Sequence, residues 1–343
     1  MRVLNRVFPL VLLLLASAPS PAYADTLERG PYLQMGTPHS MTIRWRTDVA
    51  SISRVQYGSS PISLDSTVTN EAVSFDHEVT LSGLSPDSKY YYAILDSSDA
   101  FLSGPDEAHF FITSPPVGMN NTTRAWVIGD SGTADGNARA VYDAFQARVG
   151  PNYTDLWIML GDNAYNDGTD DEYQAAVFDM YPELLKQSPL WATLGNHDGH
   201  SADSASQAGP YYDIFTLPAD AQAGGVRSGT EAYYSFDYGQ VHFICLDSYE
   251  TSRAPDDAML TWLETDLQAT NQKWIVAFWH HPPYTKGSHN SDTEGALIDM
   301  RVNALPILES YGVDLVLSGH SHSYERSYLL DGHYGSSGTL DPS

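Results

Sequence analysis

Side chains that bind metal ions recur in the second part of the sequence, where short apolar runs end. Five such points occur in order and supply Asp130, Asp162, Asn196, His197, His280, His320 and His322. Each residue alone is more simply a turn or loop residue. Together, carboxylate, imidazole and amide groups suit borderline or hard metals, and a carboxylate can bridge two ions. Because such a pair clamps a phosphate and activates water, the pattern favours hydrolytic phosphoryl transfer.

Alternating strand and helix patterns are expected to position these groups. Strand-like runs cover residues 125–128, 156–160, 190–194, 274–279 and 313–317, helical periodicity covers 138–149, 172–186, 257–268 and 298–310, and a hairpin is predicted over 233–246. This alternation is typical of an α/β domain with a largely parallel sheet flanked by helices. Since parallel strands end at the same edge of a sheet, side chains far apart in sequence can meet there.

A β-rich segment precedes this domain. Residues 25–114 carry short alternating runs separated by Gly, Pro, Ser and Asp, which predict an all-β sandwich. The stretch from Leu84 to Tyr90 resembles the corner of fibronectin type III domains, in which a tyrosine hydroxyl ties back the loop. Residues 115–122 are a linker by composition, and residues 123–343 form the second domain.

The first 24 residues have the features of a secretory signal peptide. Arg2 and Arg6 precede an apolar run over residues 7–16, and Ala22-Tyr23-Ala24 has the small-x-small form of a signal-peptidase site. The run is shorter than the about 20 residues that cross a bilayer. We therefore expect cleavage after Ala24 and a secreted protein, extracellular or periplasmic, that is not bound to a membrane. An uncleaved anchor is the alternative.

The composition excludes several classes of function. The 343 residues contain 43 acidic and 17 basic side chains, for a net charge of −26. This charge repels nucleic acid and anionic membranes, so neither is an expected partner. The hydrophobic content of 42% is sufficient for packed cores and argues against disorder. Because Cys245 is the only cysteine, the sequence has no internal disulfide and no cysteine-rich metal site.

The five motifs are similar, in type and order, to those of purple acid phosphatases within the calcineurin-like metallophosphoesterases. They are Gly129-Asp130-Ser131-Gly132, Gly161-Asp162-Asn163-Ala164-Tyr165, Gly195-Asn196-His197-Asp198, His280-His281-Pro282 and Gly319-His320-Ser321-His322. Four match fully; the fourth has Ala277 in place of the usual Val but keeps the His-x-Pro order that marks His280 as the ligand. The resemblance covers residues 27 to about 330 and includes the fibronectin-like N-terminal domain of the plant-type enzymes.

This resemblance implies a dinuclear metal centre. An Fe(III) ion would be held by Asp130, Asp162, Tyr165 and His322, and a second ion, Fe(II), Zn(II) or Mn(II), by Asp162, Asn196, His280 and His320. Tyr165 marks the purple subfamily, because its phenolate holds Fe(III). His197 is implied as a donor to phosphate or to the nucleophilic oxygen, and His289 as a substrate ligand that protonates the leaving group. Asn290 stands where plant-type enzymes often carry a second histidine, which weakens the general-acid assignment.

The predicted function is that of a secreted acid phosphatase that hydrolyses phosphate monoesters by attack of a metal-bound hydroxide. A phosphodiesterase or nucleotide phosphatase on the same scaffold, and a surface-binding protein with an impaired site, are the alternatives. A small phosphate ester is the expected partner; the physiological substrate and the oligomeric state stay open. Since the family's domain has further strands after the Gly-His-x-His motif, we expect this chain to lack part of the second sheet.

Overall fold

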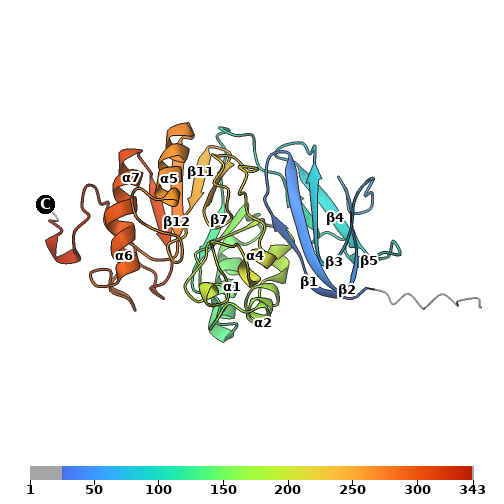
Figure 1. Cartoon of the computed structure of the whole chain (residues 1–343). Coiled ribbons are helices and arrows are strands. Elements are labelled where there is room, and N and C mark those ends of the chain that lie inside the picture. Colours follow the sequence, from blue (N-terminus) through green and yellow to red (C-terminus); the bar gives the residue numbers. More distant parts are fainter. Residues whose placement is uncertain (1–24, 342–343) are drawn as a thin grey trace, which may run out of the picture.

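The computed structural model describes residues 25–341, in which an all-β N-terminal part is joined to an α/β part (Figure 1). This arrangement confirms the fold class predicted from the sequence. The predicted signal peptide, residues 1–24, lies outside the described residues. Within residues 25–341, no helix combines the length and the apolar character needed to span a bilayer.

The N-terminal part consists of β1 (Leu27–Gln34), β2 (Ser40–Gly58), β3 (Ser66–Ser82), β4 (Lys89–Leu95), β5 (Phe101–Ser103) and β6 (Phe110–Ile112). Strand β2 pairs antiparallel with β3 along much of its length, with β1 through its first half and with β4 through its second half. Strand β4 in turn pairs with β5 and β6. Alternate side chains of these strands, Trp45, Tyr92 and Phe111 among them, form one core, as period-two alternation predicts.

The predicted tyrosine corner closes the turn before β4. The hydroxyl of Tyr90 accepts a hydrogen bond from the backbone N–H of Ser85, 3.0 Å away. The hydroxyl of Ser88 donates to the carbonyl of Pro86 at 2.9 Å. These two bonds satisfy polar groups that the turn would otherwise leave without partners.

The α/β part is built on two sheets rather than on one largely parallel sheet. The first consists of the parallel strands β7 (Ala125–Ile128), β8 (Leu156–Met159) and β9 (Leu190–Ala192). The second has the order β10 (Tyr234–Tyr238), β11 (Val241–Cys245), β12 (Trp274–Trp279) and β13 (Leu315–Ser318). Here β10 and β11 form the predicted antiparallel hairpin, and the remaining pairs are parallel. A single core of buried side chains joins both sheets.

Two helices agree with the sequence pattern, and two others contain a π-helical segment. Helices α1 (Gly136–Val149) and α5 (Ala258–Ala269) lie within two residues of their predicted bounds. The predicted helix over 172–186 consists of α2 (Asp170–Tyr173), a π-helix (Gln174–Phe178) and, after a break, α3 (Pro182–Leu185). The predicted helix over 298–310 is continuous but has a π-helical middle, as α6 (Gly295–Asp299), a π-helix (Met300–Ala304) and α7 (Leu305–Ser310). Pro182 and Pro306 lack the N–H of a regular α-helical bond, which periodicity alone does not register.

The N-terminal sheet packs directly against the α/β part. Tyr32 of β1 donates its hydroxyl to the carbonyl of Ile214, 2.9 Å away, at the end of α4 (Pro210–Ile214), and its ring joins the α/β core. Arg44 of β2 donates to the carbonyls of Asp213 and Ile214 at 2.7 and 2.5 Å. Because the last carbonyls of a helix have no partner within it, these residues supply the missing donors.

Candidate metal centre

The predicted ligands occupy sharp turns at the carboxyl ends of parallel strands. Asp130 follows β7, Asp162 follows β8, and His320 and His322 follow β13; all four have a positive φ, between 44 and 68°. Non-glycine residues rarely adopt this conformation, and those that do cluster at functional sites. A Cβ atom on Gly319 would lie 2.8 Å from Asp130 Oδ2. The last loop of one sheet therefore meets the first loop of the other.

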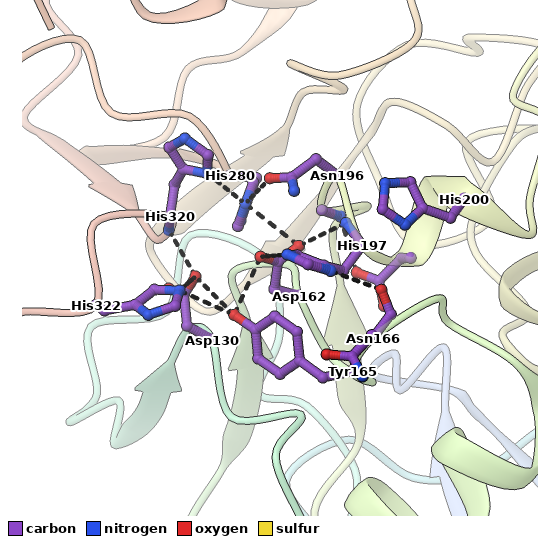
Figure 2. A network of polar contacts seen from close by, with 12 residues as sticks. Asp130, Asp162, Tyr165, Asn166, Asn196, His197, His200, His280, His320 and His322 are labelled. Carbon is purple, nitrogen blue, oxygen red and sulfur yellow. Dashed lines mark hydrogen bonds and ion pairs between the residues drawn. The ribbon is translucent and has the colours of Figure 1, made fainter. Parts of the chain in front are cut away.

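One group of predicted ligands converges on the hydroxyl of Tyr165 (Figure 2). This oxygen lies 3.1 Å from Asp162 Oδ2, 3.1 Å from His322 Nε2 and 3.4 Å from Asp130 Oδ1. His322 Nε2 is also 3.5 Å from Asp130 Oδ1. Asp162 is buried, whereas the His322 side chain is 52% exposed. This group, the tyrosine set, is therefore open to solvent on one side.

A second group converges on His280 Nε2. This nitrogen lies 3.1 Å from Asn196 Oδ1, 3.1 Å from His320 Nδ1 and 3.4 Å from Asp162 Oδ1. Asp162 belongs to both groups through its two oxygens, which is the position of a bridging carboxylate. His280 is fully buried, and its Nδ1 donates to the carbonyl of Leu160 at 2.8 Å, which orients the ring. We call this group the histidine set.

Both sets fit a metal ion better than they fit hydrogen bonding among themselves. Ligand atoms held about 2.0–2.2 Å from one ion lie about 3.0–3.5 Å apart, as the atoms of both sets do. Because His280 donates its Nδ1 proton to Leu160, only Nε2 remains for the oxygens of Asn196 and Asp162 and for the His320 ring. One proton at Nε2 can serve a single acceptor, whereas a metal ion can be bound by all of them. The residues present therefore fit a dinuclear centre.

The carboxylates dominate the electrostatics of the site. Burial opposes a charge on His280, but hydrogen bonding and attraction to Asp162 raise its pKa to about 9. Burial, together with the charges of Asp130 and Asp162, raises the pKa of Tyr165 far above its ordinary value. Burial and the neighbouring histidines lower the pKa of His320 to about 4, so its ring is neutral at ordinary pH, as the predicted ligand role requires. A cation entering the site displaces the protons of His280 and Tyr165.

The two residues predicted to act on the substrate flank these sets. The backbone N–H of His197 donates to Asp162 Oδ1 at 2.9 Å, and its Nδ1 donates to the carbonyl of Asn166 at 2.6 Å. The ring centroid of His289 lies 3.7 Å from that of His320. Both side chains are about one-third exposed, 31% for His197 and 33% for His289. The structure thus brings all nine predicted site residues into one cluster.

Two further acidic residues support the cluster, although the sequence reasoning gave them no role. Glu294 Oε2 accepts from His289 Nδ1 at 2.9 Å and lies 3.4 Å from His320 Nε2, so it orients both rings. The buried Asp198 accepts from the backbone N–H groups of Gly195 and Asn163, at 2.9 and 3.1 Å, and thereby joins two ligand loops. Asp198 closes the third motif, which is a signal; no spacing rule points to Glu294.

Comparison with known proteins assigns the chain to a family. The model of the calcineurin-like phosphoesterases matches residues 123–324, and that of the purple acid phosphatase N-terminal domain matches residues 29–113. The chain belongs to the calcineurin-like phosphoesterase family. With the second match and the relatives described next, the resemblance to purple acid phosphatases is confirmed, and this family implies a dinuclear metal centre.

Similar curated proteins are named as acid phosphatases. Purple acid phosphatase 15 of Arabidopsis thaliana is 27% identical over 278 residues, which are 73% of this chain and 49% of that protein. Acid phosphatase type 7 of Mus musculus is 27% identical over 344 residues, which are 90% of this chain and 72% of that protein. The chain spans between about half and two thirds of the length of the Arabidopsis relatives.

Solved structures share the fold across most of the chain. The purple acid phosphatase PPD1 from seeds of yellow lupin, Lupinus luteus, superposes with a TM-score of 0.64 at 16% identity, over 85% of this chain and 58% of that one. The structure of PhoD superposes with a TM-score of 0.65 at 15% identity, over 89% and 73% of the two chains. At these identities the likeness concerns the fold alone.

Proposed function

We propose that this protein is an acid phosphatase that hydrolyses phosphate monoesters at a dinuclear metal centre. One observation carries the proposal: the tyrosine set and the histidine set share Asp162, and a tyrosine hydroxyl lies within 3.1 Å of that shared carboxylate. His197 and His289, each about one-third exposed, flank these two sets. The family match and the acid phosphatase relatives support the same reaction.

The proposed metals follow from the donor atoms of each set. Fe(III) would occupy the tyrosine set, Asp130, Asp162, Tyr165 and His322, because a phenolate and two carboxylates suit a hard trivalent ion. Fe(II), Zn(II) or Mn(II) would occupy the histidine set, Asp162, Asn196, His280 and His320. When bound, the two ions supply Lewis-acid stabilisation of the phosphate and an activated water. An acidic pH optimum is expected, because Fe(III) acidifies water more strongly than a divalent ion does.

The two partly exposed histidines, His197 and His289, would contact the substrate. His197 Nδ1 donates to the carbonyl of Asn166, and its Nε2 lies 4.0 Å from Asp162 Oδ2, which supports a role as donor to a phosphate oxygen. His289 Nδ1 donates a hydrogen bond to Glu294, so Nε2 would be the atom that donates to the leaving oxygen. Asn290 directs its amide oxygen to Lys286 Nζ, 2.7 Å away. His289 is therefore the better general-acid candidate of the two neighbours.

The remaining parts of the proposal concern the molecule's surroundings. Residues 1–24 would be removed on export, residues 25–114 would form a fibronectin-like domain, 115–122 a linker and 123–343 the catalytic domain. The protein would act outside the cytoplasm on small phosphate esters. The net charge of −26 supports this choice, because nucleic acid and anionic membranes would be repelled. The ions alone would then attract the phosphate, so the metal-free chain should not bind a phosphate ester.

The test combines turnover with a spectrum. The chain, loaded with iron and zinc, is assayed on a simple aryl phosphate, a phosphodiester and ATP between about pH 4 and 8, and its metal content is measured. We expect the monoester to be preferred and a visible tyrosinate-to-Fe(III) band that Tyr165→Phe abolishes. Tyr91→Phe is the matched control, because Tyr91 also donates its hydroxyl to a carboxylate, that of Glu107 in the N-terminal part.

Three results would contradict the proposal in different ways. No turnover at any pH with both ions bound would overturn the enzymatic reading and favour a surface-binding protein. Preference for the diester or for ATP would move the substrate class. Full activity with zinc or manganese alone and no colour would overturn Fe(III) while leaving the phosphatase in place.

A further inference from the structure

The short helix α2, between the ligand loop of Tyr165 and the rest of the first sheet, contacts three separate parts of the molecule. The side chain of Asp170 binds Arg29 of the N-terminal sheet, that of Glu172 binds the backbone of the preceding loop, and that of Tyr173 binds the buried Asp198. A helix of this length has no stability of its own, because nucleation costs more than one turn returns. Its position is therefore set by what these side chains bind.

Asp170 is held by the N-terminal sheet. Its Oδ2 accepts from Arg29 Nη2 of β1 at 2.9 Å and from Arg46 Nη1 of β2 at 2.6 Å. Arg29 also donates from Nε to Gln174 at 2.9 Å, and its guanidinium lies 4.5 Å from the ring centroid of Phe178. Arg29 is buried and Asp170 is 38% exposed, so water screens their ion pair from one side only.

Arg46 is itself fixed from the opposite side. Its Nε and Nη2 donate to the two carboxylate oxygens of Asp76 in β3, at 2.8 and 3.1 Å. A guanidinium held in this bidentate manner has few rotamers left, so it presents Nη1 to Asp170 in a defined direction. The arginine that binds α2 is thus held in place by the N-terminal sheet, unlike the side chains of a flexible surface ion pair.

Glu172 connects α2 to the loop that follows Tyr165. Its carboxylate accepts from the backbone N–H groups of Asn166, Asp167 and Thr169, at 2.6, 3.1 and 2.9 Å. The carbonyl of Asn166 in turn accepts from His197 Nδ1 at 2.6 Å. Figure 2 shows Asn166 and Tyr165 beside the His197 ring at the tyrosine set. The conformation of this loop therefore fixes the positions of Tyr165 and His197.

Tyr173 connects α2 to the buried hydrogen bonds of Asp198. Its hydroxyl donates to Asp198 Oδ1 at 2.6 Å, and Asp198 holds the backbone of Gly195 and Asn163. Asn163 follows the bridging Asp162, and Gly195 precedes the ligand Asn196. The third side chain of α2 thus supports the loops that carry the shared ligand and one ligand of the histidine set.

We propose that the N-terminal domain positions the metal centre through α2, with Arg29 and Arg46 as positioning residues and Asp170 as the point of attachment. All nine site residues come from the α/β part, so the domain contributes geometry rather than ligands. The arginines act on Tyr165 and His197 through Glu172, and on the loops of Asp162 and Asn196 through Tyr173 and Asp198. The claim about loop order is independent of the proposed phosphatase activity; only its kinetic consequence rests on that function.

The experiment measures amide hydrogen exchange in the full metal-free chain. Asp170→Asn removes the charge that both arginines bind while keeping the shape of the side chain. We expect the amides of residues 166–169 to exchange at least about tenfold faster, because charge-assisted bonds hold the segment. The amides of β8 serve as an internal reference for global stability and should not change.

Asp99→Asn is the matched control, because it removes the ion pair between Asp99 and Arg54 within the N-terminal part. It should leave residues 166–169 unchanged. Equal exchange in both variants would overturn the proposal. Faster exchange in β8 by the same factor would also overturn it, because Asp170 would then serve stability in general. If Asp170→Asn does not fold, Arg46→Gln, which keeps Arg29 in place, gives the same comparison.

The kinetic arm uses the metal-loaded chain and separates this inference from the proposed function. If the protein is a phosphatase, Asp170→Asn should lower kcat about tenfold or more with a smaller change in KM, because misplaced groups act in the transition state. It should also shift or broaden the tyrosinate band. A wild-type chain without turnover would defeat the proposed function alone, since the exchange measurement would still decide the role of the N-terminal domain.

Discussion

Two buried histidines, His242 and His280, have opposite surroundings although the pKa of each is raised to about 9. His242 of β11 places Nδ1 2.8 Å from Asp237 Oδ1 and Nε2 2.8 Å from Asp266 Oδ2. An imidazolium ring has two N–H donors, so one proton beyond the neutral ring satisfies both carboxylates. The triad of Asp237, His242 and Asp266 is complete without any other ion.

His280 has more acceptors than protons can satisfy. Its Nδ1 donates to a backbone carbonyl, and only Nε2 remains for an amide oxygen, a carboxylate oxygen and another imidazole nitrogen. A single proton at Nε2 can serve one of these partners, whereas a metal ion serves them all. The comparison shows that a raised histidine pKa does not itself mark a metal site. The number of converging acceptors distinguishes the predicted ligand His280 from the structural residue His242.

The largest expected effect comes from Asp162→Asn, which removes the carboxylate shared by both sets. Loss of Lewis-acid stabilisation is worth several kcal/mol, so we expect turnover to fall by about 10³–10⁴-fold. Metal content should fall together with turnover, while circular dichroism stays that of a folded chain. Activity within tenfold of the wild type, or two ions still retained, would show that Asp162 does not bridge.

The next effect concerns the closed triad, where Asp266→Asn should cost stability rather than activity. Asp266 is fully buried and also accepts from Ser235 and from the backbone of Val226. Removing one member of a buried ion group costs about 3–5 kcal/mol. Denaturant unfolding should report this loss, with metal content and turnover of the folded fraction unchanged. A variant that loses its metals while keeping its stability would reverse the assignment of the two clusters.

The ligand set could be predicted from the sequence because the positions of its residues follow from topology. Each predicted ligand lies within about six residues after a strand end, and parallel strands present those ends at one edge. Glu294, Asp170 and the two arginines could not be found in this way. They come from loops, from helix starts and from the faces of another sheet, where contact depends on how whole elements pack. The two π-helical segments could not be predicted either, since apolar periodicity does not report where the hydrogen-bond spacing along a helix changes.

The pH dependence of stability sharpens the comparison further. Burial opposes the charge on His242, but hydrogen bonds and attraction to Asp237 and Asp266 raise its pKa to about 9. A raised folded-state pKa contributes stability that is present in full below the unfolded value of about 6.5 and is lost as the pH rises through about 9. The contribution is about 3 kcal/mol at one pKa unit per about 1.4 kcal/mol.

This contribution is measured as the difference in unfolding free energy between the wild type and His242→Asn, both in the same metal state. Titrations elsewhere, including those at the metal centre, then cancel. The difference should be greatest below about pH 6.5 and should shrink by about 3 kcal/mol toward pH 10. A difference that does not vary with pH would mean that His242 is neutral and that one of the two carboxylates carries the proton.

The smallest expected effect comes from Glu294→Gln, which changes the partner of His289. The surroundings of His289 differ from those of both His242 and His280. Of the two ring nitrogens of His289, only Nδ1 has a hydrogen-bond partner among residues 25–341, and that partner is Glu294. Nε2 therefore stays available to a substrate. A glutamine still accepts the hydrogen bond but no longer stabilises a positive ring. Outer groups of this kind contribute about 10–100-fold to activity. We expect a loss near tenfold on an alkyl phosphate, whose leaving oxygen needs a proton, and a smaller loss on a nitrophenyl phosphate.

The ratio of the two losses decides between the possible roles of Glu294. If Glu294 keeps His289 protonated for the leaving group, the loss depends on how basic that leaving group is. If it only orients His320 in the histidine set, both esters are affected equally and metal affinity falls. Glu309→Gln is the control, because Glu309 of α7 holds the Tyr334 hydroxyl and the backbone of Gly332. In the first case His289, which has one carboxylate partner, would act in catalysis, whereas His242, which has two, contributes to stability.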